Sequence, residues 1–320
     1  MAVHTPVPAR DLDGFLAEYG LPPASMAKGI AEGIENTNYL VESGGRRFIL
    51  TLYEARVSAD DLPYFLSLMT HTAEAGLPVA RAMPGTDGEA LRTLMGRPAA
   101  LVEFLPGTSP DAPTAAEAEA AGAAMARLHL AAQAFGQARA NDQGPVGWRQ
   151  LANTLAERME GLGEGVTDEV ERHLAAVLAV WPQHLPRGTI HADLFPDNVL
   201  YEGGAVTGLI DFYFACTDFF AYDVAVALNA WVPEPGEGEA VDARNALAFL
   251  SGYERIRKLT ESEREALPVL ARGAAMRFFL TRTQDWLARE ASALVRVKDP
   301  LPYLRLARHH ASAMTDEDDE

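Results

Sequence analysis

The spacing of apolar side chains separates a mixed first third of the chain from a mostly helical remainder. Apolar residues recur at helical intervals over 8–19 and over about 60–75, and both stretches are predicted helices. Short apolar or β-branched runs between glycine-containing turns predict three strands, over 34–41, 46–53 and 99–104. The first hundred residues therefore predict a small sheet with a helix packed on it.

Beyond Gly107 the apolar pattern is helical almost throughout. Helices are predicted over 114–132, 148–160, 167–181, 218–231, 240–257 and 261–290. The strand signals in this part are 198–201 and 206–210, which predict a hairpin over two glycines. We therefore expect an α+β chain with a small antiparallel-sheet N-terminal lobe (1–107) and a mostly helical C-terminal lobe (108–314), and a nucleotide would bind in the cleft between such lobes.

The charge of the chain limits its partners. Its 320 residues carry a formal net charge of −18, and removing the five acids of the predicted disordered tail (315–320) still leaves about −13. A nucleic-acid partner is not expected, because binding a phosphate backbone needs a basic face. No apolar run is long enough to predict a membrane span, and the first residues lack the pattern of a secretory signal. A single cysteine, Cys216, is compatible with a reducing compartment, so a cytoplasmic location is expected.

The strongest chemical signal is the run His191-Ala-Asp193-Leu-Phe-Pro-Asp-Asn198, followed by Asp211 at the end of an apolar run. This spacing is typical of phosphoryl transfer from a nucleotide. Asp193 is the candidate catalytic base, and the oxygens of Asn198 and Asp211 are candidate ligands of Mg²⁺. Each residue taken alone could instead form a turn or cap an element. Together they predict a small-molecule kinase with ATP and Mg²⁺ as cofactors.

Three further polar residues near this motif are interpreted as structural. His191 is expected to position the loop through its ring hydrogen bonds, and Asp197 to face solvent or cap a turn. Asp223 falls on an apolar predicted helix, where a buried carboxylate needs donors. The backbone amides of the Asp193 loop are a plausible source of those donors.

A second candidate site lies near the N-terminus. The stretch 29–38 places glycines and small polar residues in a β-turn-β element, where backbone amides can approach phosphates closely. An ordinary hairpin loop is the alternative. The candidate nucleotide-binding residues here are Lys28, Gly29, Gly33, Asn36, Thr37 and Asn38.

Several of these runs resemble a known superfamily. The ranges 29–41, 48–53, 103–107, 191–198 and 210–212 are similar to the aminoglycoside-phosphotransferase/choline-kinase superfamily, which has the two-lobed protein-kinase-like fold. More narrowly, the runs 28–36, 190–198, 209–218, 267–279 and 298–303 resemble the bacterial homoserine kinase family of this fold. The similarity covers nearly the whole chain apart from the acidic tail.

The resemblance implies ATP-dependent phosphorylation of the L-homoserine side-chain hydroxyl to O-phospho-L-homoserine, a step of threonine biosynthesis. It implies that Asp193 is the base and that Asn198 and Asp211 hold Mg²⁺. It also implies that backbone groups of Glu103 and Leu105 contact the adenine. The expected partners are thus the small molecules ATP and L-homoserine, while the sequence does not indicate an oligomeric state.

The sequence departs from the general kinase pattern in its third strand. Thr51 stands where a lysine normally pairs with the α- and β-phosphates. Lys28, or else Arg56, is the candidate replacement cation, although an exposed lysine needs no such role. The departure also motivates an alternative function, that of a non-catalytic kinase-like binding protein.

The acceptor site is expected to contain arginine, because homoserine carries a carboxylate. Arg277 and Arg282 lie among apolar residues of one predicted helix, and Tyr213 and Asp218 follow the predicted metal strand. Arginines that lock helices together through internal ion pairs are the alternative. Related acceptors of the superfamily, namely aminoglycosides, choline or a methylthio sugar, are the second candidate function.

Overall fold

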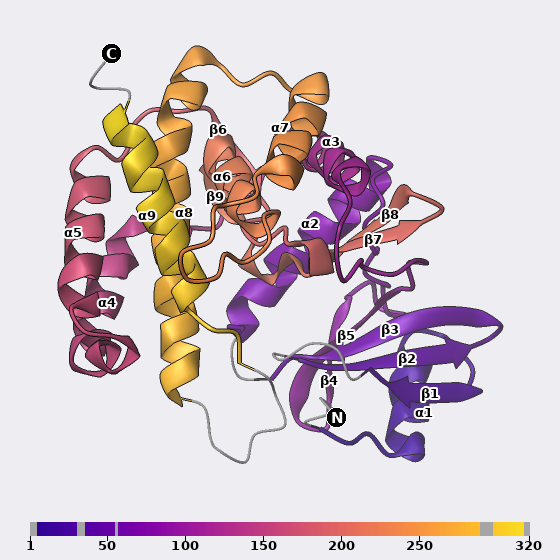
Figure 1. The fold of residues 1–320 in the computed structure, drawn as a ribbon. Coiled ribbons are helices and arrows are strands. Elements are labelled where there is room, and N and C mark those ends of the chain that lie inside the picture. Colours follow the sequence, from indigo (N-terminus) through magenta and orange to yellow (C-terminus); the bar gives the residue numbers. More distant parts are fainter. Residues whose placement is uncertain (1–4, 31–35, 55–56, 289–296, 317–320) are drawn as a thin grey trace. The chain divides into compact units, whose positions relative to one another are not determined.

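The chain divides into two compact units. The computed structural model describes residues 5–30, 36–54, 57–288 and 297–316 (Figure 1). The first unit comprises Met1–Thr108, Leu200–Glu202 and Thr207–Tyr213. The second comprises Ser109–Val199, Gly203–Val206 and Phe214–Glu320. Each unit has its own apolar core.

A five-stranded antiparallel sheet forms the centre of the first unit, with strand order β1-β2-β3-β5-β4. Its strands are β1 (Met26–Gly29), β2 (Thr37–Ser43), β3 (Arg46–Leu52), β4 (Leu91–Leu94) and β5 (Arg97–Glu103). Helix α1 (Ala9–Glu18) buries Leu12, Phe15 and Leu16 against Phe48 and Leu50 of β3. Helix α2 (Leu62–Glu74) follows a short 3₁₀ turn, η1 (Ala59–Asp61).

The hairpin of β7 (Val199–Glu202) and β8 (Ala205–Leu209) comes after the predicted lobe boundary in sequence, yet most of it belongs to the first unit. Thr108 and Tyr201 exchange backbone hydrogen bonds of 3.1 and 2.9 Å, and the Leu209 amide donates to Pro78 at 2.7 Å. Gly107 permits this approach, because a Cβ there would lie 2.7 Å from the Tyr201 carbonyl oxygen and its φ is +109°.

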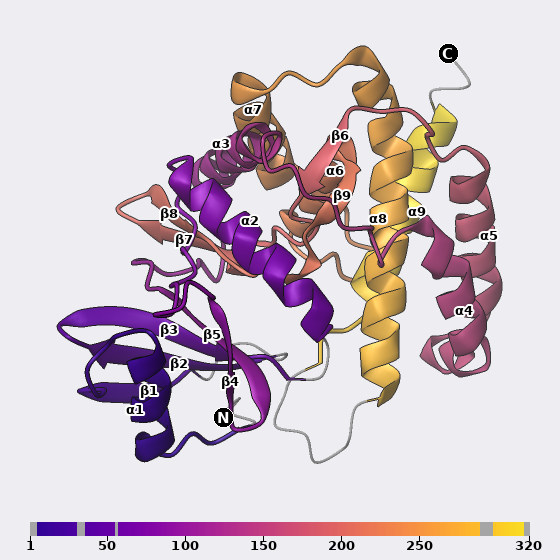
Figure 2. The same cartoon turned by 180° about the vertical axis from the view of Figure 1, so that it is seen from behind.

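Helices dominate the second unit, and among the described residues α8 (Glu261–Ala288) packs most extensively against four others. These are α4 (Pro145–Met159), α5 (Val166–Ala179), α6 (Phe220–Ala230) and α9 (Leu301–Asp316), and the two opposite views show α9 lying alongside α8 (Figures 1 and 2). The 3₁₀ turn η2 (Glu160–Leu162) follows α4. A two-stranded sheet of β6 (Arg187–Ile190) and β9 (Cys216–Phe219) completes this core.

Helices α3 (Ala115–Ala132) and α7 (Arg244–Ile256) pack closely against each other. Two glycines make the crossing possible: a Cβ at Gly122 would collide with the backbone of Phe249, and one at Gly252 with the backbone of Glu119. Since Thr114 caps α3 in a reciprocal arrangement with Glu117, the start of this helix is well defined.

The predicted fold class is confirmed, and so are the predicted helices and the hairpin, with three differences. The helix predicted over 218–231 begins at Phe220, because residues 216–219 pair with β6 as strand β9. The strand predicted over 34–41 is β2, which runs from Thr37 to Ser43. Four short strands (β1, β4, β6, β9) and helix α9 were not predicted.

The structure describes only part of the predicted tail, residues 315–320. Helix α9 ends at Asp316, so the first two residues of 315–320 are helical, and the last four lie outside the described residues. Among the described helices, none combines the length and apolar character that crossing a membrane requires.

Candidate active site

Asp193 and Asn198 of the predicted catalytic loop, residues 191–198, are hydrogen-bonded to each other in the second unit. The side-chain amide of Asn198, in the 3₁₀ turn η3 (Pro196–Asn198), donates to the Asp193 carbonyl oxygen at 2.8 Å and to Asp193 Oδ2 at 3.3 Å. Because its NH₂ group is committed to Asp193, the orientation of the Asn198 amide is fixed. Its Oδ1 oxygen is of the type that a hard cation binds.

The backbone carries strain at two chemically significant positions. Ala192, directly before Asp193, has φ of +63°, and Asp211 has φ of +64°. Only one other described non-glycine residue, Met95, has a positive φ. Such conformations cost free energy and persist where the surrounding structure enforces them, which is common at functional sites.

Asp223 on α6 holds the start of the loop, as the sequence suggested. Its carboxylate accepts the backbone amides of His191 at 2.8 Å and Ala192 at 2.7 Å, and it is fully buried. Burial alone would raise the pKa of Asp223, but hydrogen bonding to His129 and the charges and amide beside it lower the pKa below its usual value. The residue is therefore a charged anchor for the loop.

A buried polar chain continues from this anchor and was missed by sequence reasoning. His129 on α3 bridges Asp223 Oδ2 (2.8 Å) and the Tyr253 hydroxyl (2.8 Å). Arg257 donates to the same hydroxyl at 3.1 Å and to Glu263 at 2.8 Å. Because His129, Asp223 and Tyr253 lie on three helices that are far apart in sequence, no local pattern links them; a histidine in an apolar stretch was the only available signal.

The loop is also held by side chains that bind its backbone. Arg277 on α8 donates to the Ala192 carbonyl oxygen at 2.7 Å, and Trp231 donates to that of Leu194 at 2.9 Å. The ring of His191 accepts the Asp193 amide at 3.3 Å, which fits the structural part expected for it. Asp197 is largely exposed and pairs with Lys298 at 3.2 Å.

The two candidate acceptor arginines have different surroundings. Arg277 is 2 % exposed, and its guanidinium lies over the rings of Phe214 and Phe278. Arg282 pairs with the carboxylate of Glu234 at 2.6 Å and stacks on the ring of Tyr303 at 4.4 Å. Arg277 is thus a buried support of the loop, while Arg282 faces a solvent-accessible acid.

The other two candidate acceptor residues are engaged in local contacts. The Asp218 carboxylate, on β9, accepts from the Asn141 amide at 2.7 Å and from the Phe219 backbone at 2.8 Å. Tyr213 belongs to the first unit, where its hydroxyl lies 3.1 Å from that of Tyr53. Burial raises the pKa of Tyr213 to about 12; the nearby Asp211 adds to this, while hydrogen bonds to Tyr53 and Thr51 oppose it.

Asp211 likewise belongs to the first unit, whereas Asp193 and Asn198 belong to the second. It follows β8, just before the 3₁₀ turn η4 (Phe212–Phe214). The structure therefore joins two of the three predicted catalytic residues directly, and the convergence of the third with them stays a prediction.

Thr51, the residue in place of the expected lysine, is built into a hydroxyl network. It is 4 % exposed on β3, donates to Asn38 Oδ1 at 2.8 Å and is hydrogen-bonded to Tyr213. The neighbouring Asn36 and Thr37 are also buried, and both bond to Glu54. The side chains of Asn36, Thr37 and Asn38, three candidate nucleotide-binding residues, thus bond to residues in or just after strand β3.

The remaining candidates of this unit lie on the sheet or at its end. Lys28 is exposed on β1, and Gly29 pairs with Tyr39 of β2. Glu103 ends β5, with its amide bonded to the Arg81 carbonyl, and Leu105 follows it in the segment that leads to α3. Gly33 and Arg56 lie outside the described residues.

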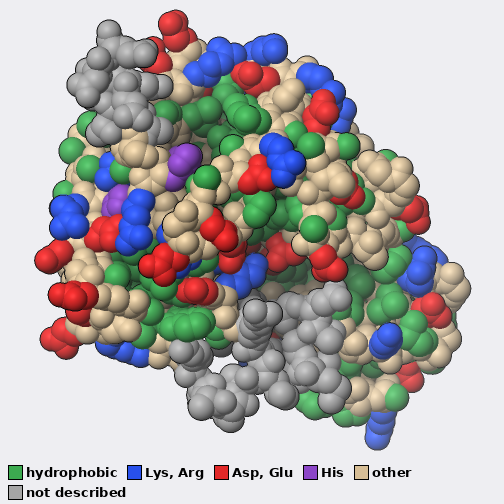
Figure 3. Space-filling model, in the orientation of Figure 1, with side chains coloured by type: hydrophobic (Ala, Val, Ile, Leu, Met, Phe, Trp, Pro, Cys, Tyr) green, Lys and Arg blue, Asp and Glu red, His purple; other side chains and the backbone are tan. Residues whose placement is uncertain are grey.

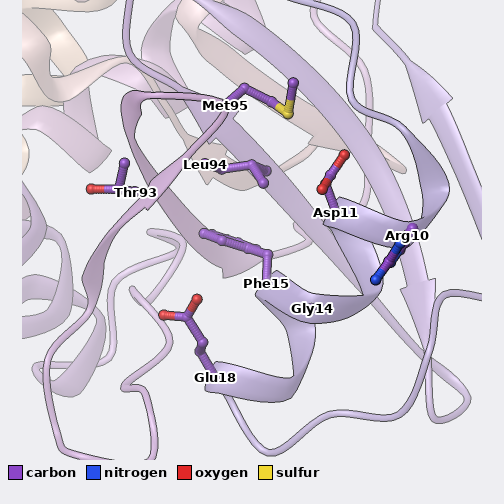
Figure 4. Close-up of a pocket in the computed structure, with 8 residues that line it drawn as sticks. All are labelled: Arg10, Asp11, Gly14, Phe15, Glu18, Thr93, Leu94 and Met95. Atoms are coloured by element: carbon purple, nitrogen blue, oxygen red, sulfur yellow. The ribbon is translucent and has the colours of Figure 1, made fainter.

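A surface depression between α1 and β4 contains none of these candidates. Side chains of both elements line it, with Phe15 and Glu18 on the helix and Leu94 and Met95 at the strand end (Figure 4). Over the face of the molecule in Figure 3, acidic and basic side chains are interspersed. Neither the depression nor this mixed surface charge points to a different location for the candidate site.

Comparison with known proteins places the chain in a family. The phosphotransferase enzyme family matches residues 27–259, and the chain belongs to this family. It is 50 % identical over 315 residues to a homoserine kinase of Caulobacter vibrioides, covering 98 % of this chain and 99 % of that protein. It is 48 % identical to a homoserine kinase of Sinorhizobium fredii, covering 98 % and 96 % of the two chains.

Solved structures agree on the fold. A spectinomycin phosphotransferase in complex with ADP and spectinomycin has a TM-score of 0.67 at 14 % identity, covering 95 % of each chain. A microcompartment-associated aminopropanol kinase has a TM-score of 0.67 at 20 % identity, covering 94 % of this chain and 97 % of that one. An amicoumacin kinase in complex with AMP-PNP and Ca²⁺ also has a TM-score of 0.67, at 16 % identity, covering 90 % and 88 %.

Proposed function

We propose that this enzyme transfers the γ-phosphoryl group of ATP to the side-chain hydroxyl of L-homoserine and forms O-phospho-L-homoserine for threonine biosynthesis. Full-length relatives named homoserine kinase, at about 50 % identity, support the acceptor. The observation that carries the chemistry is the Asp193–Asn198 pair on a loop whose backbone is fixed from beneath by Asp223. A rigid loop of this kind is what positional and electrostatic catalysis needs.

In this proposal Asp193 orients the acceptor hydroxyl and accepts its proton as the oxygen attacks phosphorus. Asn198 supplies an amide oxygen to the metal, because its NH₂ group is already used in binding Asp193. Asp211 supplies a carboxylate oxygen. Bound Mg²⁺ would neutralise charge on the phosphates, and the donor set of one amide and one carboxylate suits a cation that keeps water and phosphate ligands.

We assign the nucleotide to the first unit. The backbone around Lys28, Gly29, Gly33, Asn36, Thr37 and Asn38 would cover the phosphates, and backbone groups of Glu103 and Leu105 would meet the adenine. Since the side chains of Asn36, Thr37 and Asn38 bond within the sheet, their proposed contacts are through the backbone. Lys28, exposed on β1, is the proposed replacement for the missing lysine.

We propose residues 1–107 as the nucleotide-binding lobe, 108–314 as the catalytic and acceptor lobe and the end of the chain as an acidic tail. The partners are ATP and the acceptor, without nucleic acid, and the location is cytoplasmic. Asp218 and Tyr213 are candidates for contacts with the acceptor ammonium group.

A panel of hydroxylated acceptors in a coupled assay of ADP release tests the function. L-Homoserine with Mg²⁺-ATP is expected to give the highest kcat/KM, above L-serine, L-threonine, choline and an aminoglycoside. A higher value for choline or the aminoglycoside would establish the alternative kinase function. Nucleotide binding without turnover of any acceptor would establish the kinase-like binding protein suggested by Thr51.

A further inference from the structure

The guanidinium of Arg282 is fixed on three sides. It stacks over the Tyr303 ring at 4.4 Å, donates to the Asp299 carbonyl oxygen at 3.1 Å and pairs with Glu234 Oε1 at 2.6 Å. The first two partners belong to α9 and the segment before it, and Glu234 lies between α6 and α7. Only one of these three partners carries a charge.

The two members of the ion pair differ in exposure. The side chain of Arg282 is 9 % exposed, whereas that of Glu234 is 50 % exposed. A buried guanidinium needs an anion beside it, because an unpaired charge away from water is costly. The half-exposed carboxylate can return to water at little cost. The site therefore requires an anion, but not Glu234 in particular.

This anion site is continuous with the catalytic loop. Phe195 of the loop, Phe278 and Tyr303 form a row of rings with centroid separations of 5.0 and 5.2 Å. Lys298, next to Asp299, contacts the loop by pairing with Asp197 at 3.2 Å. Burial raises the pKa of Tyr303; the positive charge of Arg282 opposes this, and the charges of Glu234, Asp193 and Asp197 add to it. The Tyr303 ring, on which Arg282 stacks, is thus connected to Phe195 of the catalytic loop through the ring of Phe278.

We propose that Arg282 binds the α-carboxylate of the acceptor and that Glu234 occupies this position until the acceptor displaces it. The inference rests on the proposed function and names the group that recognises its substrate. The acceptor carboxylate takes over the hydrogen bond that Arg282 now donates to Glu234 Oε1, while Tyr303 and the Asp299 carbonyl keep the guanidinium in place. Arg277 is not available for this purpose, because it is buried and bound to the Ala192 carbonyl.

The proposal gives two substitutions opposite effects. In Arg282→Gln the carboxylate loses its cation, and KM for L-homoserine is expected to rise at least about tenfold. In Glu234→Gln the competing anion is removed, and KM for L-homoserine is expected to fall about threefold or more. The KM for ATP stays within about twofold in both. If the Arg282–Glu234 pair only stabilised the fold, both substitutions would impair the enzyme, and neither would lower KM for L-homoserine.

The experiment measures KM and kcat of the full chain with L-homoserine, and with 3-aminopropan-1-ol, which is homoserine without its carboxylate. The kcat/KM for 3-aminopropan-1-ol is expected to be the same in Arg282→Gln and the unaltered enzyme. Arg244→Gln and Asp242→Asn, which break an exposed pair at the start of α7, are matched controls and should leave every constant unchanged.

The outcomes separate this inference from the proposed function. Failure of the unaltered enzyme to phosphorylate L-homoserine overturns the function. Turnover of L-homoserine with KM raised in Glu234→Gln, or unchanged in Arg282→Gln, overturns the inference alone. If Arg282→Gln does not fold, Glu234→Gln still decides the question, because it alters a half-exposed side chain and its expected effect is a gain in apparent affinity.

Discussion

The guanidinium of Arg277 donates to the carbonyl oxygen of Ala192 at 2.7 Å, one residue before the proposed base. Ala192 has φ of +63°, a conformation that needs support from its surroundings. Asp223 binds the amide of the same residue from the other side at 2.7 Å. The peptide groups on both sides of Ala192 are therefore fixed by buried charged side chains, and this sets the direction of Asp193.

Arg277→Met is expected to lower kcat about tenfold and to destabilise the fold by about 1–3 kcal/mol. Methionine fills much of the volume of the arginine side chain. The Ala192 carbonyl, however, loses its donor, so Asp193 is less well oriented. Kinetics together with calorimetry check the prediction, with Arg264→Met, an exposed position on the same helix, as the control. A normal kcat in Arg277→Met would show that the loop does not need this bond.

Asp223→Asn is expected to destabilise the fold by about 2–4 kcal/mol and to reduce kcat, because an amide can accept only one of the two loop amides and turns its NH₂ group towards the other. Urea unfolding at pH 7.5 measures the stability. Asp242→Asn, which removes an exposed carboxylate paired with Arg244, is the control and should unfold like the unaltered chain. Equal stability of the two variants would contradict the role of Asp223 as anchor.

Thr51→Val is expected to cost about 1–2 kcal/mol of stability, because it leaves the Oδ1 oxygen of Asn38 without its 2.8 Å donor inside the sheet. Valine keeps the shape and the strand propensity, so the hydroxyl alone is tested. Thr93→Val, at an exposed position of β4, is the matched control. If both variants unfold at the same denaturant concentration, the hydroxyl network around Thr51 contributes nothing measurable.

The elements that the sequence predicts well are those whose apolar pattern is long enough to be read locally. Helix α1 and strands β2 and β3 show clear periodicity and bury Phe15, Val41 and Phe48 in one core. Strands β6 and β9 are four residues each and pair across the chain, Gly188 with Asp218, so nothing local marks them. Tertiary pairing thus overrides the helical signal at Asp218.

The residues of the candidate site also differ in whether the local sequence predicts their contacts. Asp193 and Asn198 are five residues apart, and their direct contact follows from local spacing. His129 and Glu234 could not be predicted, because their parts depend on helices packed together from distant stretches of sequence. Thr51 stands out in the sequence because a lysine is expected there, but its hydroxyl network with Asn38 and Tyr213 depends on strand register and tertiary packing.

His310 is expected to make the fold sensitive to mild acid. Burial and the charges of His309 and Arg272 lower the pKa of His310 from 6.5 to about 4. The folded state therefore keeps this ring neutral while the unfolded chain takes up a proton, so its stability contribution is complete above pH 6.5 and is lost as the pH falls towards 4.

Between pH 7.5 and 5 this loss amounts to about 2 kcal/mol. His310→Gln can still donate to Asn229, as His310 does at 2.7 Å, but it does not titrate. Urea unfolding of both proteins across this range checks the prediction. The variant is expected to lose about 2 kcal/mol less than the unaltered chain, and parallel pH profiles would contradict the shifted pKa.

The proposed reaction depends most directly on the carboxylate of Asp193. The decisive measurement is kcat for L-homoserine with Mg²⁺-ATP in Asp193→Asn, beside Asp197→Asn as a control in the same loop whose carboxylate is largely exposed. Asp193→Asn is expected to lose at least about a hundredfold in kcat, because the base is gone while the shape is kept. Asp197→Asn is expected to stay near the unaltered rate. Near-normal turnover in Asp193→Asn would contradict the account of this site.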